Sequence, residues 1–411
     1  MEIKKFFNKR EEENHNNIDY TINLLNKEFE INNLDIVDDI ENKIKIFFKD
    51  YKNLYIELSK VDIYQEIKNH FNFINNINIS NTKKNPNFIN NNIIIENTLS
   101  LFEIYYPFGY QDEIFLVYQN VNLTLEIKSI TQNKFITSLN DISNKVTIIK
   151  HFFNLKNSFD YLCVSDTKKL IYVYNLSLNY IFLYQIKTDY SFNIFSCLLF
   201  FDNKNNNNYL ITSTYAINEN NYTKAYLLED GTFIKNYIGT NHNHSCYLLF
   251  WFHKILKCNY IIELCSEKLF IYQMITSGLY MEVNFKDIDF MKGCILEDKD
   301  KKEFLYCSTS DNMIYVFDLY KKTLAQKIEL WKEKRIPNDI YDMIKWSNKF
   351  LIICNYKNNC INVIDINQNK IITCIKGINN GKFLFLKKII HPLYGDSLLA
   401  STGNSTVNIL V

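Results

Sequence analysis

A hairpin-like pattern that recurs at a nearly constant step is the feature that most constrains this chain. In its clearest copy, a hydroxyl-rich strand end leads into Asp311-Asn312, and an alternating apolar strand then ends at Asp318. Asp and Asn tolerate the left-handed positions of tight turns, while aromatic and β-branched residues suit a half-buried pleated surface. The pattern predicts a β-hairpin.

Six more hairpins align with this copy. The positions that match Asp318 are Lys128, Asn175, Leu227, Gln273, Asp365 and Val411, at steps of 45 to 52 residues. The longest step contains an Asn-rich insert at 203–208, which a surface turn tolerates at little cost. Within one unit, strand-like runs at 290–296, 303–309, 313–319 and 323–330 make four strands. A constant step indicates a repeated supersecondary unit, and a pair of β-sandwiches would not explain it.

The two ends of the repeat region complement each other. Residues 406–411 make only a third strand for the last unit, whereas the run at 93–97 precedes the first full unit as an orphan strand. If the orphan strand completes the last unit, the ring closes and an exposed sheet edge disappears. We therefore predict a seven-bladed β-propeller over residues 93–411, closed by the strand at 93–97.

The repeats resemble those of the WD40 family. The resemblance rests on Phe317-Asp318 and Ile364-Asp365, with Tyr174-Asn175 as a conservative variant of the aromatic-Asp pair that ends a WD40 third strand. It implies an all-β, seven-bladed WD40-like propeller that acts as a non-catalytic scaffold for partner proteins. Three alternatives stay open: a substrate-presenting adaptor of a ubiquitin ligase or trafficking complex, a subunit like the G-protein β subunit, and a propeller enzyme.

The first third of the chain has a different pattern. We expect a flexible tail at 1–17, a helical arm at 18–74 that includes a coiled-coil pattern, and an Asn-rich linker at 75–92. Within the arm, apolar residues alternate at spacings of three and four, as in a coiled-coil seam. The seam residues are Val37, Ile40, Ile44, Phe47, Tyr51, Leu54, Leu58 and Val61. The seam packs on the chain's own propeller, on a second copy, or on a helical partner protein.

Composition narrows the class of partner. The net charge is +1, and Arg occurs only at Arg10 and Arg335, so nucleic acid is not expected as a partner. All ten Cys fall between Cys163 and Cys374, mostly in apolar runs, which indicates reduced thiols in the cytoplasm or nucleus. The apolar runs are too short to cross a bilayer, and the charged N-terminus predicts no signal peptide.

Motifs for catalysis, cofactors or metals are not found. The sequence contains no Gly-rich phosphate loop, no His-Glu-x-x-His and no Gly-x-Ser-x-Gly, so we expect neither an enzyme nor a cofactor. The His and Cys cluster would need convergent side chains to hold a metal, but a strand through it makes them diverge. Its members are His242, His244, Cys246, His253 and Cys258.

The predicted protein-binding residues lie in loops between units. Trp331, Lys334 and Arg335 bring a Trp beside the one Arg of the propeller region, and both residue types are enriched at interface hot spots. The alternative is that Trp331 ends a strand and packs between units. Tyr190, His242 and His244 are weaker candidates for the same rim.

Overall fold

The computed structural model describes residues 91–411 except for short segments. Those segments are 109–111, 155–157, 189, 191–192, 203–206, 215–222, 238–246, 331–339, 356–358, 377–381 and 404. The described residues all belong to one compact unit, Ile67–Val411. The predicted tail, the helical arm and all of the linker except Asn91 and Asn92 lie outside them.

The described residues are all-β and form small antiparallel sheets. Among them, five sheets have four strands each. In spatial order these sheets are β2 (Thr98–Tyr105), β3 (Phe115–Asn120), β4 (Leu125–Ser129), β5 (Lys134–Leu139); β6 (Val146–Asn154), β7 (Phe159–Asp166), β8 (Leu170–Asn175), β9 (Ile181–Lys187); β10 (Ile194–Asp202), β11 (Asn207–Thr214), β12 (Thr223–Leu227), β13 (Phe233–Tyr237); β21 (Ile340–Lys345), β22 (Phe350–Asn355), β23 (Cys360–Asp365), β24 (Lys370–Lys376); and β1 (Asn91–Glu96), β27 (Thr406–Leu410), β26 (Gly395–Thr402), β25 (Phe383–His391).

The sixth sheet has seven strands because one long strand belongs to two neighbouring groups. Its order is β14 (Tyr247–His253), β15 (Cys258–Leu264), β16 (Ser266–Gln273), β17 (Leu279–Glu297), β18 (Glu303–Thr309), β19 (Met313–Asp318) and β20 (Thr323–Glu329). Residues 279–284 of β17 pair with β16, whereas residues 290–297 pair with β18. Gly293 permits this close packing, since an added Cβ would lie 2.7 Å from Leu264 Cδ1 and 2.9 Å from Leu249 Cδ1.

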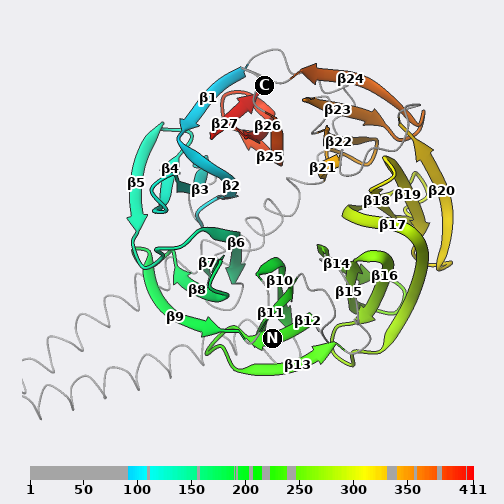
Figure 1. Cartoon of the computed structure of the whole chain (residues 1–411), viewed down its shortest axis with the longest axis horizontal. Coiled ribbons are helices and arrows are strands. Elements are labelled where there is room, and N and C mark those ends of the chain that lie inside the picture. Colours follow the sequence, from blue (N-terminus) through cyan, green and yellow to red (C-terminus); the bar gives the residue numbers. More distant parts are fainter. Residues whose placement is uncertain are drawn as a thin grey trace, which may run out of the picture. The chain divides into compact units, whose positions relative to one another are not determined.

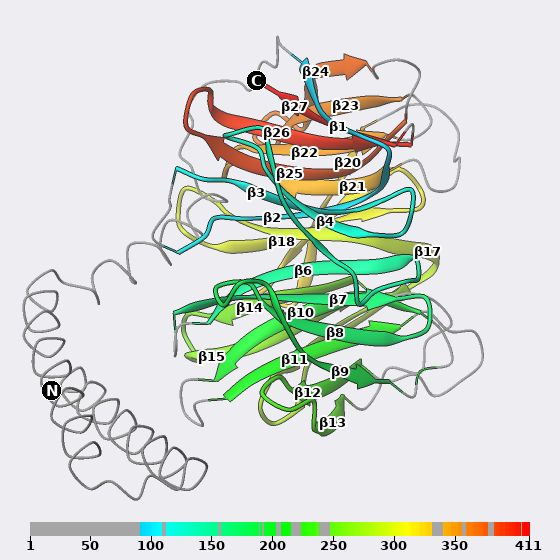
Figure 2. The ribbon, with the colours of Figure 1, turned by 90° about the vertical axis from the view of Figure 1, so that its left-hand side faces the viewer.

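The sheets follow one another around a common centre (Figure 1) and lie face to face when viewed from the side (Figure 2). Hydrophobic clusters fill the spaces between neighbours. One cluster joins Val117 and Ile127 of the sheet β2–β5 to Leu162 and Val164 of β7. Each sheet therefore buries its apolar faces against the sheets beside it, which is how layered β-structure forms a core.

A β-bulge recurs at the same place in six pairings of a third strand with a fourth strand. The second residue of the third strand after this register shift is Ser129, Asn175, Leu227, Gln273, Asp318 or Asp365. The register thus makes Ser129 the counterpart of Asp318 in the first unit, and the sequence alignment with Lys128 is wrong by one residue.

Except for Leu227, the residues at this position are polar, and their side chains bond to the following turn. Asp318 Oδ1 accepts hydrogen bonds from the N–H groups of Tyr320 at 3.0 Å and Lys321 at 2.8 Å. Ser129 Oγ accepts from the Gln132 N–H at 3.1 Å. Side chains that bond to the backbone two or three residues on are typical turn formers, so the aromatic-Asp pair has a structural role.

The first described strand pairs with the last. β1 runs antiparallel to β27, from Asn91 opposite Leu410 to Glu96 opposite Thr406. Ile95 is 6% exposed and lies in a cluster with Phe102, Val407 and Ile409, which come from both ends of the described chain. The expected orphan strand at 93–97 falls largely within β1, and the edge of β27 is covered. Among the described residues, no helix has the length and apolar character needed to span a membrane.

Truncating Ile95 tests how much stability this pairing contributes. We expect Ile95→Ala to lower the free energy of unfolding by about 2–4 kcal/mol, because a buried aliphatic side chain is removed. The exposed neighbour Glu96 is the control, and Glu96→Ala should change the free energy of unfolding by less than about 0.5 kcal/mol. Urea unfolding followed by circular dichroism measures both. An unchanged melting transition after deletion of residues 93–97 would refute the role of the pairing.

Candidate functional site: a charged cluster on the inner strands

Most residues proposed for protein binding lie outside the described residues. These are Trp331, Lys334, Arg335, His242 and His244. The helical seam also lies outside them, at Val37, Ile40, Ile44, Phe47, Tyr51, Leu54, Leu58 and Val61. Their proposed roles remain predictions.

Tyr190 is described, and it lies in the interior rather than on an exposed rim. Its side chain is 3% exposed. Its hydroxyl donates to the Thr212 carbonyl oxygen at 2.9 Å and lies 2.8 Å from Thr212 Oγ1, while Lys224 Nζ lies 4.6 Å from the ring centroid. Its ring packs in the core between two sheets, so it does not offer a partner protein the surface that the sequence suggested.

Two members of the His and Cys cluster, His253 and Cys258, are also described. His253 Nε2 lies 3.2 Å from the Tyr280 hydroxyl, and its Nδ1 accepts the Leu256 N–H at 3.2 Å. Burial lowers the pKa of His253. Both ring nitrogens have partners within the protein, and the part of the chain that the structure describes contains no group of three residues suited to a metal.

Charged residues from different sheets approach one another. Their strands, among them β2, β6, β21 and β25, lie nearest the common centre of the sheets (Figure 1). We call this group the inner-strand cluster. It consists of Glu103 on β2, Lys150 on β6, Tyr247 on β14, Lys292 on β17, Asp342 on β21 and Lys387 on β25. The sequence brings them together only through the ring, since Glu103 and Lys387 are 284 residues apart.

Glu103 links three sheets. Lys387 Nζ lies 2.8 Å from Glu103 Oε1 and donates to Oε2 at 3.0 Å, and Lys150 Nζ lies 3.8 Å from Oε2. Burial alone would raise the pKa of the Glu103 carboxyl, but Lys387 and Lys150 together outweigh burial and hold that pKa below its ordinary value of 4.5. The carboxylate is therefore charged at neutral pH and neutralised by its partners.

Lys292 and Asp342 complete the cluster on the opposite side. Lys292 Nζ lies 4.2 Å from the centroid of the Tyr247 ring, a cation–π distance. Burial lowers the pKa of Lys292, and the positive charges of Lys387 and Lys150 add to this effect, whereas Asp342 opposes it. Burial raises the pKa of Asp342, although its oxygens accept the N–H groups of Leu386 at 2.8 Å and Met343 at 3.0 Å.

The geometry of the cluster cross-links neighbouring sheets. Glu103 is held by two ammonium groups from other sheets, and Asp342 on β21 accepts the N–H group of Leu386 on β25. Sequence reasoning missed all six residues because each sits singly in a strand-like run. The available signal was a charged residue within the first strand of several units.

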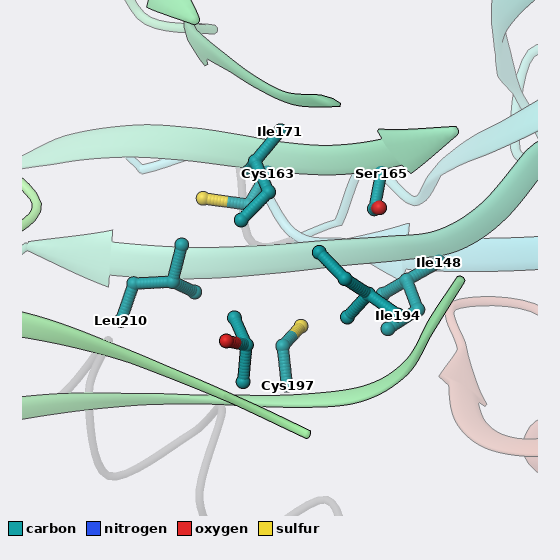
Figure 3. A pocket seen from close by; sticks show the side chains of 8 residues that line it. Ile148, Cys163, Ser165, Ile171, Ile194, Cys197 and Leu210 are labelled. Carbon is teal, nitrogen blue, oxygen red and sulfur yellow. The ribbon is translucent and has the colours of Figure 1, made fainter. Parts of the chain in front are cut away.

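A small cavity lies between the second and third sheets (Figure 3). Its volume of about 10 Å³ is near that of one water molecule. Cys163 and Cys197 line it, and burial raises the pKa of both thiols, to about 12 for Cys197. Thiols with raised pKa values are poor nucleophiles, and a volume of about 10 Å³ leaves no room for a substrate larger than a water molecule.

The opposite pKa shifts of Glu103 and Asp342 predict opposite effects of pH on stability. A carboxyl whose pKa is lowered by folding stabilises the native state above its unfolded pKa, and this contribution disappears as the pH falls through the folded pKa. Glu103→Gln should therefore cost roughly 1.5–3 kcal/mol at pH 7, the range for hydrogen bonds to charged groups. The difference from wild type should shrink below about pH 4.5.

Asp342→Asn is the matched variant. The pKa of Asp342 is raised by folding, so the wild-type carboxyl becomes more favourable for folding as the pH falls and it takes up a proton. Relative to the Asn variant, the wild type should therefore gain stability on acidification. Urea titrations between about pH 3 and pH 8 measure both variants. Parallel pH profiles for the two variants would show that the cluster does not have these electrostatics.

Comparison with known proteins supports the fold alone. No family model matches the sequence, and no curated protein matches it. Among solved structures, the chain is similar to the crystal structure of the computationally designed Ika8 protein, with a TM-score of 0.52 and 13% sequence identity. The similarity covers 76% of this chain and 82% of the designed protein.

Proposed function

We propose that residues 93–411 form a seven-bladed, WD40-like propeller and that the chain is a non-catalytic scaffold for protein–protein interaction. Dividing β17 between its two pairing partners gives seven groups of four strands, in agreement with the sequence repeat. The recurrent bulge with its polar turn residue supports the same division. The helical arm would supply a second attachment point, and the free thiols fit the cytoplasm or nucleus.

The observation that carries the proposal is an exposed apolar surface on the hairpin of β14 and β15. Phe250 is 42% exposed and Phe252 is 40% exposed on β14, and Ile255 and Leu256 in the following turn are 73% and 52% exposed. We call these four residues the β14–β15 apolar surface. Single exposed apolar residues are common, but four on one hairpin are typical of a surface that a partner protein covers.

The residues beside this surface show why it is not part of the core. Trp251 alternates with Phe250 and Phe252 along β14, is 2% exposed, and donates from Nε1 to Glu303 Oε2 at 3.0 Å. The strand therefore has one buried face and one exposed face that is also apolar. A solvated strand face normally carries polar residues, so the exposed phenylalanines are unexplained by folding alone.

Replacing the two exposed apolar residues of the turn with aspartate tests the interaction surface. We expect the double variant Ile255→Asp/Leu256→Asp to recover at least about tenfold less of the proteins that the full-length wild type captures, because charge in an apolar contact is costly to desolvate. Its melting temperature should stay close to that of the wild type, since both side chains are exposed. Affinity capture with quantitative mass spectrometry measures the recovery.

The matched control is Leu393→Asp. Leu393 is 80% exposed in the turn between β25 and β26, which also joins a first strand to a second strand. This variant should capture the same proteins as the wild type. Equal recovery by wild type, control and double variant would contradict the proposed surface.

A further inference from the structure

A cavity between the sheets β2–β5 and β6–β9 is large enough to hold a ligand. Its volume is about 460 Å³, within the range of roughly 300–1,000 Å³ that is typical of ligand sites. Its wall includes the aromatic residues Tyr105, Phe108, Phe115 and Tyr180. It is separate from both the inner-strand cluster and the β14–β15 apolar surface, and neither of them explains it.

The aromatic rings of the wall are held in place by contacts with other residues. Tyr105 meets Phe115 edge-on, with ring centroids 5.2 Å apart, and Phe108 stacks on Phe153 at 5.3 Å. The Tyr105 ring also stacks on the ring of His151, with centroids 4.9 Å apart. Fixed rings lose little conformational entropy when a ligand binds, so this surface is pre-organised.

Two carboxyl groups also line the cavity. Asp160 Oδ1 lies 2.8 Å from His151 Nε2, and Asp160 Oδ2 accepts the Phe108 N–H at 3.1 Å. These contacts fix the orientation of the carboxyl group and leave lone pairs on both oxygens.

Glu113 is the second carboxyl group, and it is half-buried. Its Oε2 accepts hydrogen bonds from Ser129 Oγ at 2.8 Å and from Thr131 Oγ1 at 2.7 Å, and Gln132 donates to Oε1. Burial alone would raise the pKa of Glu113, but these three hydrogen bonds together lower it. Glu113 therefore carries a negative charge at neutral pH.

The charge of the wall decides which class of ligand fits. None of the twelve described residues that line the cavity is Lys, Arg or His, so among the described residues its wall combines aromatic faces with carboxylates. An anion would be repelled, and a purely apolar ligand would desolvate the carboxylates without compensation. A metal ion is disfavoured because the described residues offer no group of three ligands. Aromatic faces and carboxylates together suit an organic cation.

We propose that this cavity binds an organic cation, namely an ammonium or guanidinium group on a flexible carbon chain. The cationic head lies between Glu113 and Asp160, and the carbon chain packs on the rings of Phe115 and Tyr180. Such a group is found on a Lys or Arg side chain of a peptide and also on a free small amine. This inference goes beyond the proposed scaffold function and does not depend on it, since it concerns another surface.

Calorimetric titration of the full-length protein tests the proposal with four probes. Nα-acetyl-arginine amide and Nα-acetyl-lysine amide carry the cation, Nα-acetyl-citrulline amide has a neutral head of nearly the same shape, and agmatine is a free amine. We expect the arginine derivative to bind at least about tenfold more tightly than the citrulline derivative. Equal affinities, or no heat from any probe up to about 20 mM, would overturn the proposal.

Variants locate the binding site. Glu113→Gln keeps the shape of the side chain, and we expect it to weaken binding of the arginine derivative roughly tenfold. Tyr180→Leu should weaken it by a similar factor through loss of the aromatic face. The location of the site does not depend on whether Tyr180→Leu changes the melting temperature, because Glu113→Gln is the deciding variant.

The matched control is Glu126→Gln. Glu126 is a carboxylate of the same sheet that is held by Tyr118 and Asn120 and is not part of the cavity wall. Binding should be unchanged in this variant, and equal weakening by Glu113→Gln and Glu126→Gln would overturn the proposed site. Tighter binding of the arginine derivative than of agmatine identifies a peptide as the source of the cation, and tighter binding of agmatine identifies a free amine. Either order of affinities supports the site.

Discussion

The pairing of β1 with β27 is the contact on which the arrangement of the sheets depends. It joins strands from the two ends of the described chain, and the cluster around Ile95 adds apolar packing at the same junction. The ion pair of Glu103 with Lys387 links this sheet to the sheet β2–β5, and the Ile390 N–H donates to the Tyr106 hydroxyl at 3.0 Å. The other sheets are built from strands that follow one another in the chain, whereas this sheet is completed by a strand from the other end of the described residues.

Apolar and charged residues contribute to this structure in different places. The spaces between sheets are filled by buried aliphatic and aromatic side chains, which form the hydrophobic core. On the inner strands, Glu103 is neutralised by lysines from two neighbouring sheets. Two further features are a cavity with carboxyl groups in its wall, beside Glu113, and the exposed apolar side chains of the β14–β15 hairpin.

Local patterns predicted much of the strand structure. The strands expected at 303–309 and 313–319 agree with β18 and β19, because alternating apolar residues and Asp-containing turns act within a few residues of each other. The alignment at Lys128 was off by one residue because the side chains at Lys128 and Ser129 are both polar, and only the register shift between β4 and β5 separates them. Tyr190 was misjudged because burial depends on neighbouring sheets, which no local pattern reports.

By itself the sequence determined the all-β character, the repeated step and the turn residues, since these follow from alternation and from hydrogen bonds between near neighbours. Only the tertiary structure decided which charged side chains meet, which cavity has a carboxylate wall and which apolar residues stay exposed. The physical reason is distance along the chain: Glu103 meets Lys387 across 284 residues, and Glu113 and Asp160 share a cavity only because their sheets pack together. No local sequence pattern reports contacts between side chains that are so far apart in the chain, because these contacts form only when the sheets pack together.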